Sequence, residues 1–422
     1  MTADRSFLFS LEQIGIKLGL DQIRALLTVL DHPEHVFPSI LVAGTNGKGS
    51  VTAMLERGLR AAGYRTGRYT SPHLLRLEER VAIDGQDVLP ATLDRALDEV
   101  QRASASLPHP PSFFEATTAM ALDIFRRERV DVAVLEVGLG GRLDATNAVT
   151  PVATAITMVD FDHEEYLGHT LEAIAREKAG IIKPGTLLVL GDNPPTVDRV
   201  VAETCAAAGA PMVRATTSVD YSVRMEQGAA WIERLETPRH AYAPLHLRLN
   251  GAHQVSNALL ALRLLEELDA ERLFQIPESA IRLALEDVTW PARLELRRFH
   301  GVDVLLDGAH NPAGARALAN HVRDTYGRLL PYVVGAMRDK RVDAMLEALA
   351  TTASHFFFVA PDSARAARPD QLLAAAARIA PHVAASTADS PLEAIGRAAE
   401  LGAPVIVAGS LYLVGEVRAQ LS

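Results

Sequence analysis

The stretch "VAGTNGKGSV" places three glycines, a lysine and a serine directly behind an apolar run. Gly44, Gly47 and Gly49 allow positive φ angles, so the backbone amides can converge on an anion. The helix that follows adds the positive end of its dipole. Lys48 supplies a mobile charge for phosphate, and Ser50 a hydroxyl that can reach magnesium. An extra glycine separates the lysine from the serine, compared with the usual G-x-x-x-x-G-K-[ST]. We predict a nucleoside triphosphate site here, although a tight turn with packing glycines has the same pattern.

Three further stretches put hard metal ligands where strands should end. Glu136 ends the apolar run of "VLEVGLGGRLDATN", His163 follows another strand in "MVDFDHEEYLG", and Ser71 lies in "YTSPHL". In α/β proteins ligands bind at the carboxyl ends of strands. One carboxylate with phosphate oxygens and water suits Mg²⁺, and the histidine suggests a second ion. The competing interpretation is that His163 has a structural role, with its hydrogen bonds made within the protein. A charged Glu136 inside a buried strand is expensive unless a partner compensates it.

Lys178 lies in "IAREKAGIIKPG", on a predicted helix directly behind a glutamate. From spacing alone, an exposed lysine paired with a neighbouring acid is the favoured interpretation.

The elements that must position these groups alternate between short apolar runs and amphipathic helical patterns. This alternation predicts an α/β fold: a P-loop ATPase domain with a central, mostly parallel sheet, and a smaller C-terminal Rossmann-like domain. Residues 219–250 show β-like alternation without a good helix, and we expect an antiparallel excursion there. A new strand–loop–helix series begins after "TWPARLELRRFHG". We therefore predict domains at residues 1–294 and 298–422.

Bulk composition limits the class of protein. A chain of 422 residues favours two domains, and the net charge of -10 argues against a general nucleic-acid binder. The single cysteine, Cys205, excludes an internal disulfide framework. The N-terminus has no secretory pattern, and no apolar stretch is long enough for a bilayer. We expect a soluble, cytoplasmic monomer with no membrane and no nucleic-acid partner.

The motifs together resemble a known family. "GTNGKGS", "SPHL", "FFEATTAMA", "EVGLGGRLDATN", "DHEEYLG", "IAREKAGIIK", "GAHQVSNA", "WPARLE" and "LDGAHNP" occur in this order. As a set they are similar to the folylpolyglutamate synthase and dihydrofolate synthase family of the Mur ligase superfamily. The resemblance implies an ATP-binding domain, a C-terminal ligase domain and an active site between them.

The resemblance also assigns the nucleotide and metal contacts. The phosphates of ATP would be held by Gly44, Thr45, Asn46, Gly47, Lys48, Gly49 and Ser50. Asn257, Arg293 and Asp307 match further ATP contacts. Two Mg²⁺ ions would be bound by Ser71, Glu136, His163 and Lys178, the lysine as an N-carboxylated side chain. A carboxylated lysine is an anion and can stand beside Mg²⁺ without repulsion.

The implied reaction joins L-glutamate to a pterin acid, either dihydropteroate or a reduced folate. ATP would convert the pterin carboxylate to an acyl phosphate, which the glutamate amine attacks. Lys48, Lys178 and His310 are the expected catalytic residues, with His310 a candidate base. The resemblance forms the pterin pocket from Phe113, Phe114, Glu115, Leu143, Asp144 and Ala145. Ordinary core packing explains the two phenylalanines equally well. We expect a bifunctional enzyme.

Two other functions remain open at this point. A different Mur-type ligase could act on a peptidoglycan or cyanophycin precursor. A nucleotide-dependent switch or binding protein would need the phosphate loop but would have no evident use for the "DGAHNP" domain. A kinase is also possible in principle, but the sequence shows no catalytic-loop aspartate arrangement.

Overall fold

The computed structural model describes residues 5–15 and 17–421, and the chain divides into two compact units. Unit 1 consists of Met1–Asp220, Glu236–Ala241 and Ser256–Val288, and unit 2 of Tyr221–Leu235, Tyr242–Val255 and Thr289–Ser422. The chain therefore passes between the units several times. The domains predicted at 1–294 and 298–422 stay a prediction.

Unit 1 is built on an eight-stranded sheet with the order β4-β3-β2-β5-β1-β6-β7-β8. The strands from β2 to β8 along this order pair in parallel, while β3 and β4 add an antiparallel edge. The strands are β1 Ser39–Ala43, β2 Thr66–Tyr69, β3 Val81–Ile83, β4 Gln86–Asp87, β5 Val132–Glu136, β6 Ala153–Ile156, β7 Leu187–Leu190 and β8 Met212–Arg214. All residues of β1 and β5 are buried, as parallel strands covered on both faces require.

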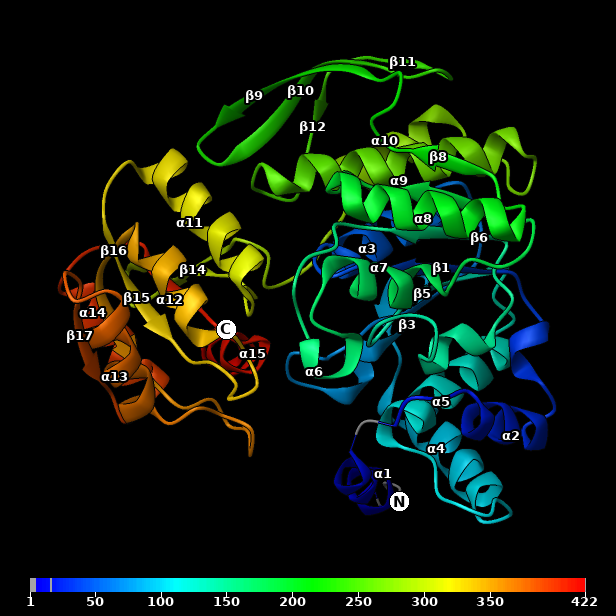
Figure 1. Cartoon of the computed structure of the whole chain (residues 1–422), viewed down its shortest axis with the longest axis horizontal. Helices are drawn as coiled ribbons and strands as arrows, with labels where there is room; N and C mark the ends of the chain where they lie inside the picture. The colour runs from blue at the N-terminus through cyan, green and yellow to red at the C-terminus, as the bar shows by residue number, and fades with distance from the viewer. Residues whose placement is uncertain (1–4, 16, 422) are drawn as a thin grey trace. The chain divides into compact units, whose positions relative to one another are not determined.

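Helices cover both faces of this sheet. In Figure 1, α4 and α5 lie on one side of it and α3 and α10 on the other. The helical elements begin with α1 Ser6–Ser10, η1 Leu11–Ile14, α2 Asp21–Val29, η2 Pro33–His35, α3 Lys48–Ala61, η3 Leu77–Arg80, α4 Pro90–Ser104 and α5 Phe113–Arg127. They continue with η4 Ala145–Ala148, α6 Glu164–Leu167, α7 Leu171–Ala179, α8 Pro195–Ala208, α9 His253–Ala270 and α10 Glu278–Glu286. The first residues of α9 belong to unit 2.

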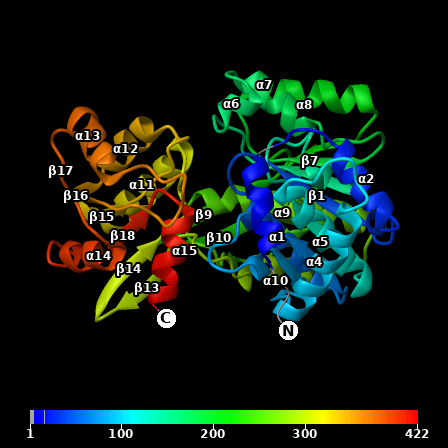
Figure 2. The ribbon, with the colours of Figure 1, turned by 90° about the horizontal axis from the view of Figure 1, so that it is seen from below.

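Unit 2 contains a six-stranded sheet in the order β13-β14-β18-β15-β16-β17, antiparallel only between β13 and β14. Right-handed crossovers place α11, α12 and α13 on one face and α14 on the other, as Figure 2 shows. The strands are β13 Glu295–Phe299, β14 Val302–Leu306, β15 Leu330–Val334, β16 Ala353–Phe358, β17 Ala384–Thr387 and β18 Val405–Ala408. The helices are α11 Pro312–Tyr326, α12 Val342–Ala350, α13 Pro369–Ile379, α14 Pro391–Ala399 and α15 Leu411–Gln420.

A small four-stranded sheet forms within residues 220–246, from β9 Asp220–Glu226, β10 Ala229–Glu236, β11 Ala241–Tyr242 and β12 Leu245–His246. Gln227 and Gly228 connect β9 to β10 and have φ angles of 50° and 84°. Two such left-handed residues suit a tight hairpin turn. Among the described residues no helix is both long and apolar enough to cross a membrane. The predicted fold class, a mostly parallel α/β sheet with a second, smaller sheet unit, is confirmed.

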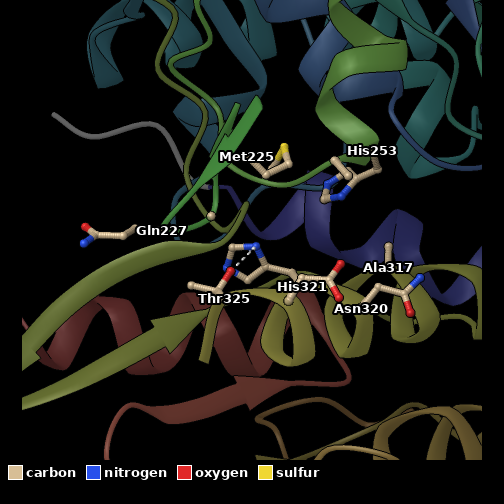
Figure 3. A pocket seen from close by; sticks show the side chains of 10 residues that line it. Met225, Gln227, His253, Ala317, Asn320, His321 and Thr325 are labelled. Atoms are coloured by element: carbon tan, nitrogen blue, oxygen red, sulfur yellow. Dashed lines mark hydrogen bonds between the residues drawn. The ribbon is translucent and has the colours of Figure 1, made fainter. Parts of the chain in front are cut away.

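Unit 2 has a cavity of about 170 Å³ beside this hairpin turn (Figure 3). Met225 and Gly228 line it from the hairpin, His253 from the start of α9, and His321 and Thr325 from α11. The Nδ1 atom of His321 lies 3.5 Å from the Thr325 hydroxyl. Burial lowers the pKa of both histidines to about 4. Both imidazoles are therefore neutral near pH 7.

We predict that His321 makes unit 2 sensitive to acid. Its folded-state pKa of about 4 lies below the value of about 6.5 in an unfolded chain. The unfolded state thus binds the extra proton first, and stability falls as the pH decreases through this window. Lowering the pH from 7.5 to 5 should reduce the free energy of unfolding by roughly 2 kcal/mol through this group. Urea unfolding should show that His321→Gln loses less stability than wild type over this range. The exposed His382→Gln should behave as wild type, and an equal loss in His321→Gln would contradict the assignment.

Candidate functional site

The phosphate loop connects β1 to α3 and is fixed by the segment after β6. A Cβ atom at Gly44 would lie 1.8 Å from the Thr157 hydroxyl, and φ there is 147°, so only glycine fits. Thr45 donates from its backbone N–H to the Met158 carbonyl (2.8 Å) and from its hydroxyl to the Asp160 carbonyl (2.9 Å). The loop is thus held rigidly before any ligand binds, with its amides at the N-terminus of α3.

Asn257, which the sequence places far from this loop, lies directly on it. A Cβ atom at Gly47 would be 2.3 Å from the Asn257 side-chain oxygen, and Gly47 has a φ of 92°. This contact brings α9 to the phosphate loop within unit 1. The predicted ATP contact from α9 is therefore adjacent to the predicted phosphate cradle.

Glu136 and Ser71 meet at the end of two neighbouring strands. Glu136 is the last residue of β5 and is 6% exposed, and its Oε2 atom accepts a hydrogen bond from the Ser71 backbone N–H (3.2 Å). The strands β2, β5, β1 and β6 are consecutive and parallel in the sheet. Their carboxyl ends therefore bring Ser71, Glu136 and the phosphate loop to one edge.

Lys178 reaches the same edge from α7. Its side chain is buried, and Nζ donates to the Gly44 carbonyl oxygen at 2.7 Å. Lys48 donates to that same carbonyl (3.3 Å) and to the Thr45 carbonyl (3.2 Å). Burial, followed by the positive charge of Lys48, lowers the pKa of Lys178 to about 7, against the opposing effect of Asp162. Lys178 is thus an unusually acidic, buried amine, and the exposed surface lysine considered from the spacing is wrong.

His163 follows β6 as the residue before α6, with a left-handed φ of 51°. Its backbone N–H donates to the Asp162 side chain at 2.9 Å. Because Asp162 acts electrostatically on Lys178, this loop lies at the same edge of the sheet. Asp162 begins the "DHEEYLG" motif, but it was not singled out as a site residue, and its proximity to Lys178 depends on the parallel register of β1 and β6.

Two of the predicted pterin-binding residues are aromatic, Phe113 and Phe114. Phe114 lies against the segment after Glu136, since a Cβ atom at Gly138 would be 2.4 Å from its ring. The guanidinium of Arg80, which the motifs did not single out, lies 5.1 Å from the centre of the Phe113 ring. Arg80 also donates to His73 Nδ1 (2.9 Å), and burial lowers the pKa of His73 to about 4.

The two predicted pterin-site carboxylates are used to shape the backbone. Glu115 Oε2 accepts from the backbone N–H and the hydroxyl of Ser112, both at 2.7 Å, and so caps α5. Asp144 accepts from the Leu139 N–H (2.8 Å) and from Thr146, and its burial raises its pKa. Leu143 and Ala145 flank this aspartate, half-buried and buried respectively.

In unit 2, Arg293, Asp307 and His310 form a separate cluster. Asp307 accepts from the N–H groups of Leu294 (3.0 Å) and Ala309 (2.9 Å). Its burial raises its pKa, while Arg293 acts in the opposite direction. A Cβ atom at Gly308 would be 2.5 Å from the Arg293 guanidinium. His310 Nδ1 donates to the Gly308 carbonyl oxygen at 2.8 Å.

Two family models match the chain. Residues 42–265 match the Mur ligase middle domain and residues 292–411 the Mur ligase glutamate ligase domain. The chain is 32% identical over 423 residues to the dihydrofolate synthase/folylpolyglutamate synthase of Bacillus subtilis, covering 99% of this chain and 98% of that protein.

Solved structures show the same fold. A Mycobacterium tuberculosis folylpolyglutamate synthase complexed with ADP aligns with a TM-score of 0.90 at 34% identity, covering 98% of each chain. A bifunctional folylpolyglutamate synthase/dihydrofolate synthase with Mn, AMPPNP and L-glutamate bound aligns with a TM-score of 0.85 at 31% identity, covering 100% of each chain. This chain therefore belongs to the dihydrofolate synthase/folylpolyglutamate synthase family of Mur ligases.

Proposed function

We propose that this protein joins L-glutamate to a pterin carboxylic acid at the expense of ATP. It would use both dihydropteroate and reduced folates, and work as a cytoplasmic monomer without a nucleic-acid partner. The observation that supports this best is the shared edge of unit 1, where the phosphate loop, Glu136, Ser71 and Lys178 converge. The ring of Phe114 lies against the same strand end. A phosphate site beside an aromatic wall suits a pterin acid that must receive a phosphoryl group.

The chemistry requires activation because a carboxylate has no adequate leaving group. A carboxylate oxygen of the pterin acid attacks the γ-phosphorus of ATP, the bond to the β-phosphate breaks, and ADP leaves. The α-amine of glutamate then attacks the acyl carbon, transfers a proton to a base, and expels phosphate. Lys48 and the amides at the start of α3 stabilise the charge on the transferring group.

The donor atoms at this edge suit Mg²⁺, and two ions are proposed to bind there. Glu136 supplies a buried carboxylate, Ser71 a hydroxyl, and His163 an imidazole. A buried carboxylate at a strand end needs a compensating partner, and oxygen donors are the ligands that Mg²⁺ prefers. Bound magnesium would neutralise the negative charge that develops during phosphoryl transfer.

Lys178 is proposed to complete the metal site as a carbamate. With a pKa of about 7, a large fraction of its amine is neutral near physiological pH. The Nζ lone pair can attack CO₂, one C–O π pair moves to oxygen, and Nζ releases a proton. The product replaces a cation that lies 2.7 Å from the Gly44 carbonyl with an anion. Two adjacent lysines thereby become an oppositely charged pair.

In the proposed division of labour, residues 1–294 hold the nucleotide phosphates and the pterin, and residues 298–422 contribute Asp307 and His310. Arg293 and Asp307 would contact ATP. The Nε2 atom of His310 would accept the proton of the glutamate amine, since Nδ1 is occupied by the Gly308 carbonyl.

The assignment is tested by a substrate panel. With ATP, Mg²⁺ and L-glutamate present, dihydropteroate and a reduced folate should each stimulate phosphate release. Each product should gain one glutamyl residue by mass spectrometry. Stimulation by only one of them would restrict the enzyme to a single activity. No stimulation by any pterin acid would overturn the proposed function.

Lys178→Ala should lower kcat by at least about a hundredfold, since it removes an anionic ligand and the charge compensation at the phosphate loop. Added acetate should restore part of the lost rate. In wild type, removing dissolved CO₂ should reduce activity. Because Lys178 must be neutral to react, the CO₂-dependent activity should rise as the pH passes upward through about 7. Lys183→Ala, at the other lysine of this segment, is the matched control. Full activity of Lys178→Ala would exclude the carbamate.

Gly138→Ala tests the placement of the pterin. The new methyl group would lie 2.4 Å from the Phe114 ring, so the ring must move. KM for dihydropteroate should rise by at least about tenfold, the effect of losing one well-packed aromatic contact, while KM for ATP changes little. Gly396→Ala, with no atom within 4 Å of its added methyl group, serves as the control. An unchanged KM for dihydropteroate would contradict the proposed contact between Phe114 and the pterin.

A further inference from the structure

A cluster of metal-binding side chains lies away from the catalytic edge, in the connection between α2 and β1. Its sequence is "DHPEH", where His32, Glu34 and His35 occupy or flank the short helix η2. Asp31 and His32 have left-handed φ angles of 61° and 49°. This tight reversal turns the His32 side chain back onto the residues that follow it.

The three side chains converge on one point. His32 Nδ1 lies 3.0 Å and His35 Nε2 lies 3.6 Å from Glu34 Oε1. One ligand atom from each residue falls within 4.8 Å of both others. Ligand atoms about 2.0 to 2.1 Å from a tetrahedral Zn²⁺ ion stand about 3.3 Å apart. The two separations from Glu34 Oε1 bracket that value. The imidazole rings are stacked at 11° with their centres 5.1 Å apart, so one ring must turn for both lone pairs to point at the same ion.

Glu34 is the unusual member of this cluster. Its side chain is only 6% exposed, whereas those of His32 and His35 are 45% and 65% exposed. Its Oε2 atom is buried and has no hydrogen-bond partner in the described part of the chain. The two histidines are its only ion-pair partners among the described residues. A buried carboxylate oxygen without a partner is costly, and a cation bound by this carboxylate would compensate it.

The ligand types select the class of metal. Mg²⁺ and Ca²⁺ prefer all-oxygen sites, whereas two imidazoles and one carboxylate form a common zinc ligand set. We propose that His32, Glu34 and His35 bind one Zn²⁺ ion, with water in the fourth position because both imidazoles face solvent. The site is independent of the ligase reaction. The bound ion stabilises the turn between α2 and β1, the strand that precedes the phosphate loop.

The proposal is tested by zinc titration of the full chain after treatment with a chelator. Saturating Mg²⁺ and ADP occupy the nucleotide site, and Zn²⁺ is added in competition with a chromophoric chelator. Wild type should bind one Zn²⁺ ion that is lost in the double variant His32→Asn/His35→Ala. Asparagine is chosen at position 32 because it tolerates left-handed backbone. His382→Ala should bind zinc as wild type does.

The variant Glu34→Gln tests whether Glu34 acts as a metal ligand or only as a packing residue. It keeps the shape of the side chain and removes only the anionic donor, so zinc affinity should fall by at least about tenfold. Zn²⁺ should raise the Tm of wild type and of His382→Ala but not that of the double variant. Ligase activity with Mg²⁺ should be unchanged in all of these variants. Zinc binding by the double variant equal to that of wild type, or none by wild type, would overturn the site.

Discussion

The arrangement of unit 1 depends on four neighbouring strands that run in the same direction. Because β2, β5, β1 and β6 are parallel and buried on both faces, their carboxyl ends form one edge where loop residues and ligand-binding groups can gather. Ser71, Glu136 and the phosphate loop occupy three of these ends, and the loop with His163 the fourth. Residues separated by more than a hundred positions thus share one edge, and side-chain hydrogen bonds such as those from Lys178 to Gly44 and from Thr45 to Asp160 then hold them together. The sheet register is what assembles the site.

Two lysine side chains bring positive charge close together at this edge of the sheet. Lys48 and Lys178 both donate to the Gly44 carbonyl, and the charge of the first lowers the pKa of the second. Lys178 is buried and Lys48 half-buried, so their like charges disfavour the charged form of Lys178. Binding of phosphate, or the proposed carboxylation of Lys178, would relieve this repulsion. The same electrostatic argument would therefore link nucleotide binding to the proposed metal site.

The sequence predicted the parts of the site whose chemistry is local. Gly44 and Glu136 could be identified because a phosphate-binding glycine loop and a carboxylate at a strand end can each be recognised from about ten consecutive residues. The structural role of Glu115 was readable from the sequence, because Ser112 and Glu115 have the spacing of a capping box, although the motif resemblance placed Glu115 in the pterin pocket instead. The hydrogen bond from the Leu139 N–H to Asp144 depends on the loop conformation, which spacing does not reveal. The exchange of segments around β9 to β12 between the units was equally hidden. The proximity of Asp162 to Lys178 arises from the tertiary structure and not from their spacing in the sequence.

Arg293 occupies an unusual stretch of backbone in unit 2. It lies between Ala292 and Leu294, whose φ angles of 59° and 49° are unfavourable for residues with a Cβ atom. Asp307 fixes the Leu294 N–H, and Glu295 accepts from the Ala292 N–H at 2.9 Å. The Asp307 and Glu295 carboxylates therefore hold a backbone with unfavourable φ angles, and the Arg293 guanidinium lies against Gly308 and acts electrostatically on Asp307. In the proposed contact with ATP, this side chain would already be positioned, so little ordering entropy would be lost on binding.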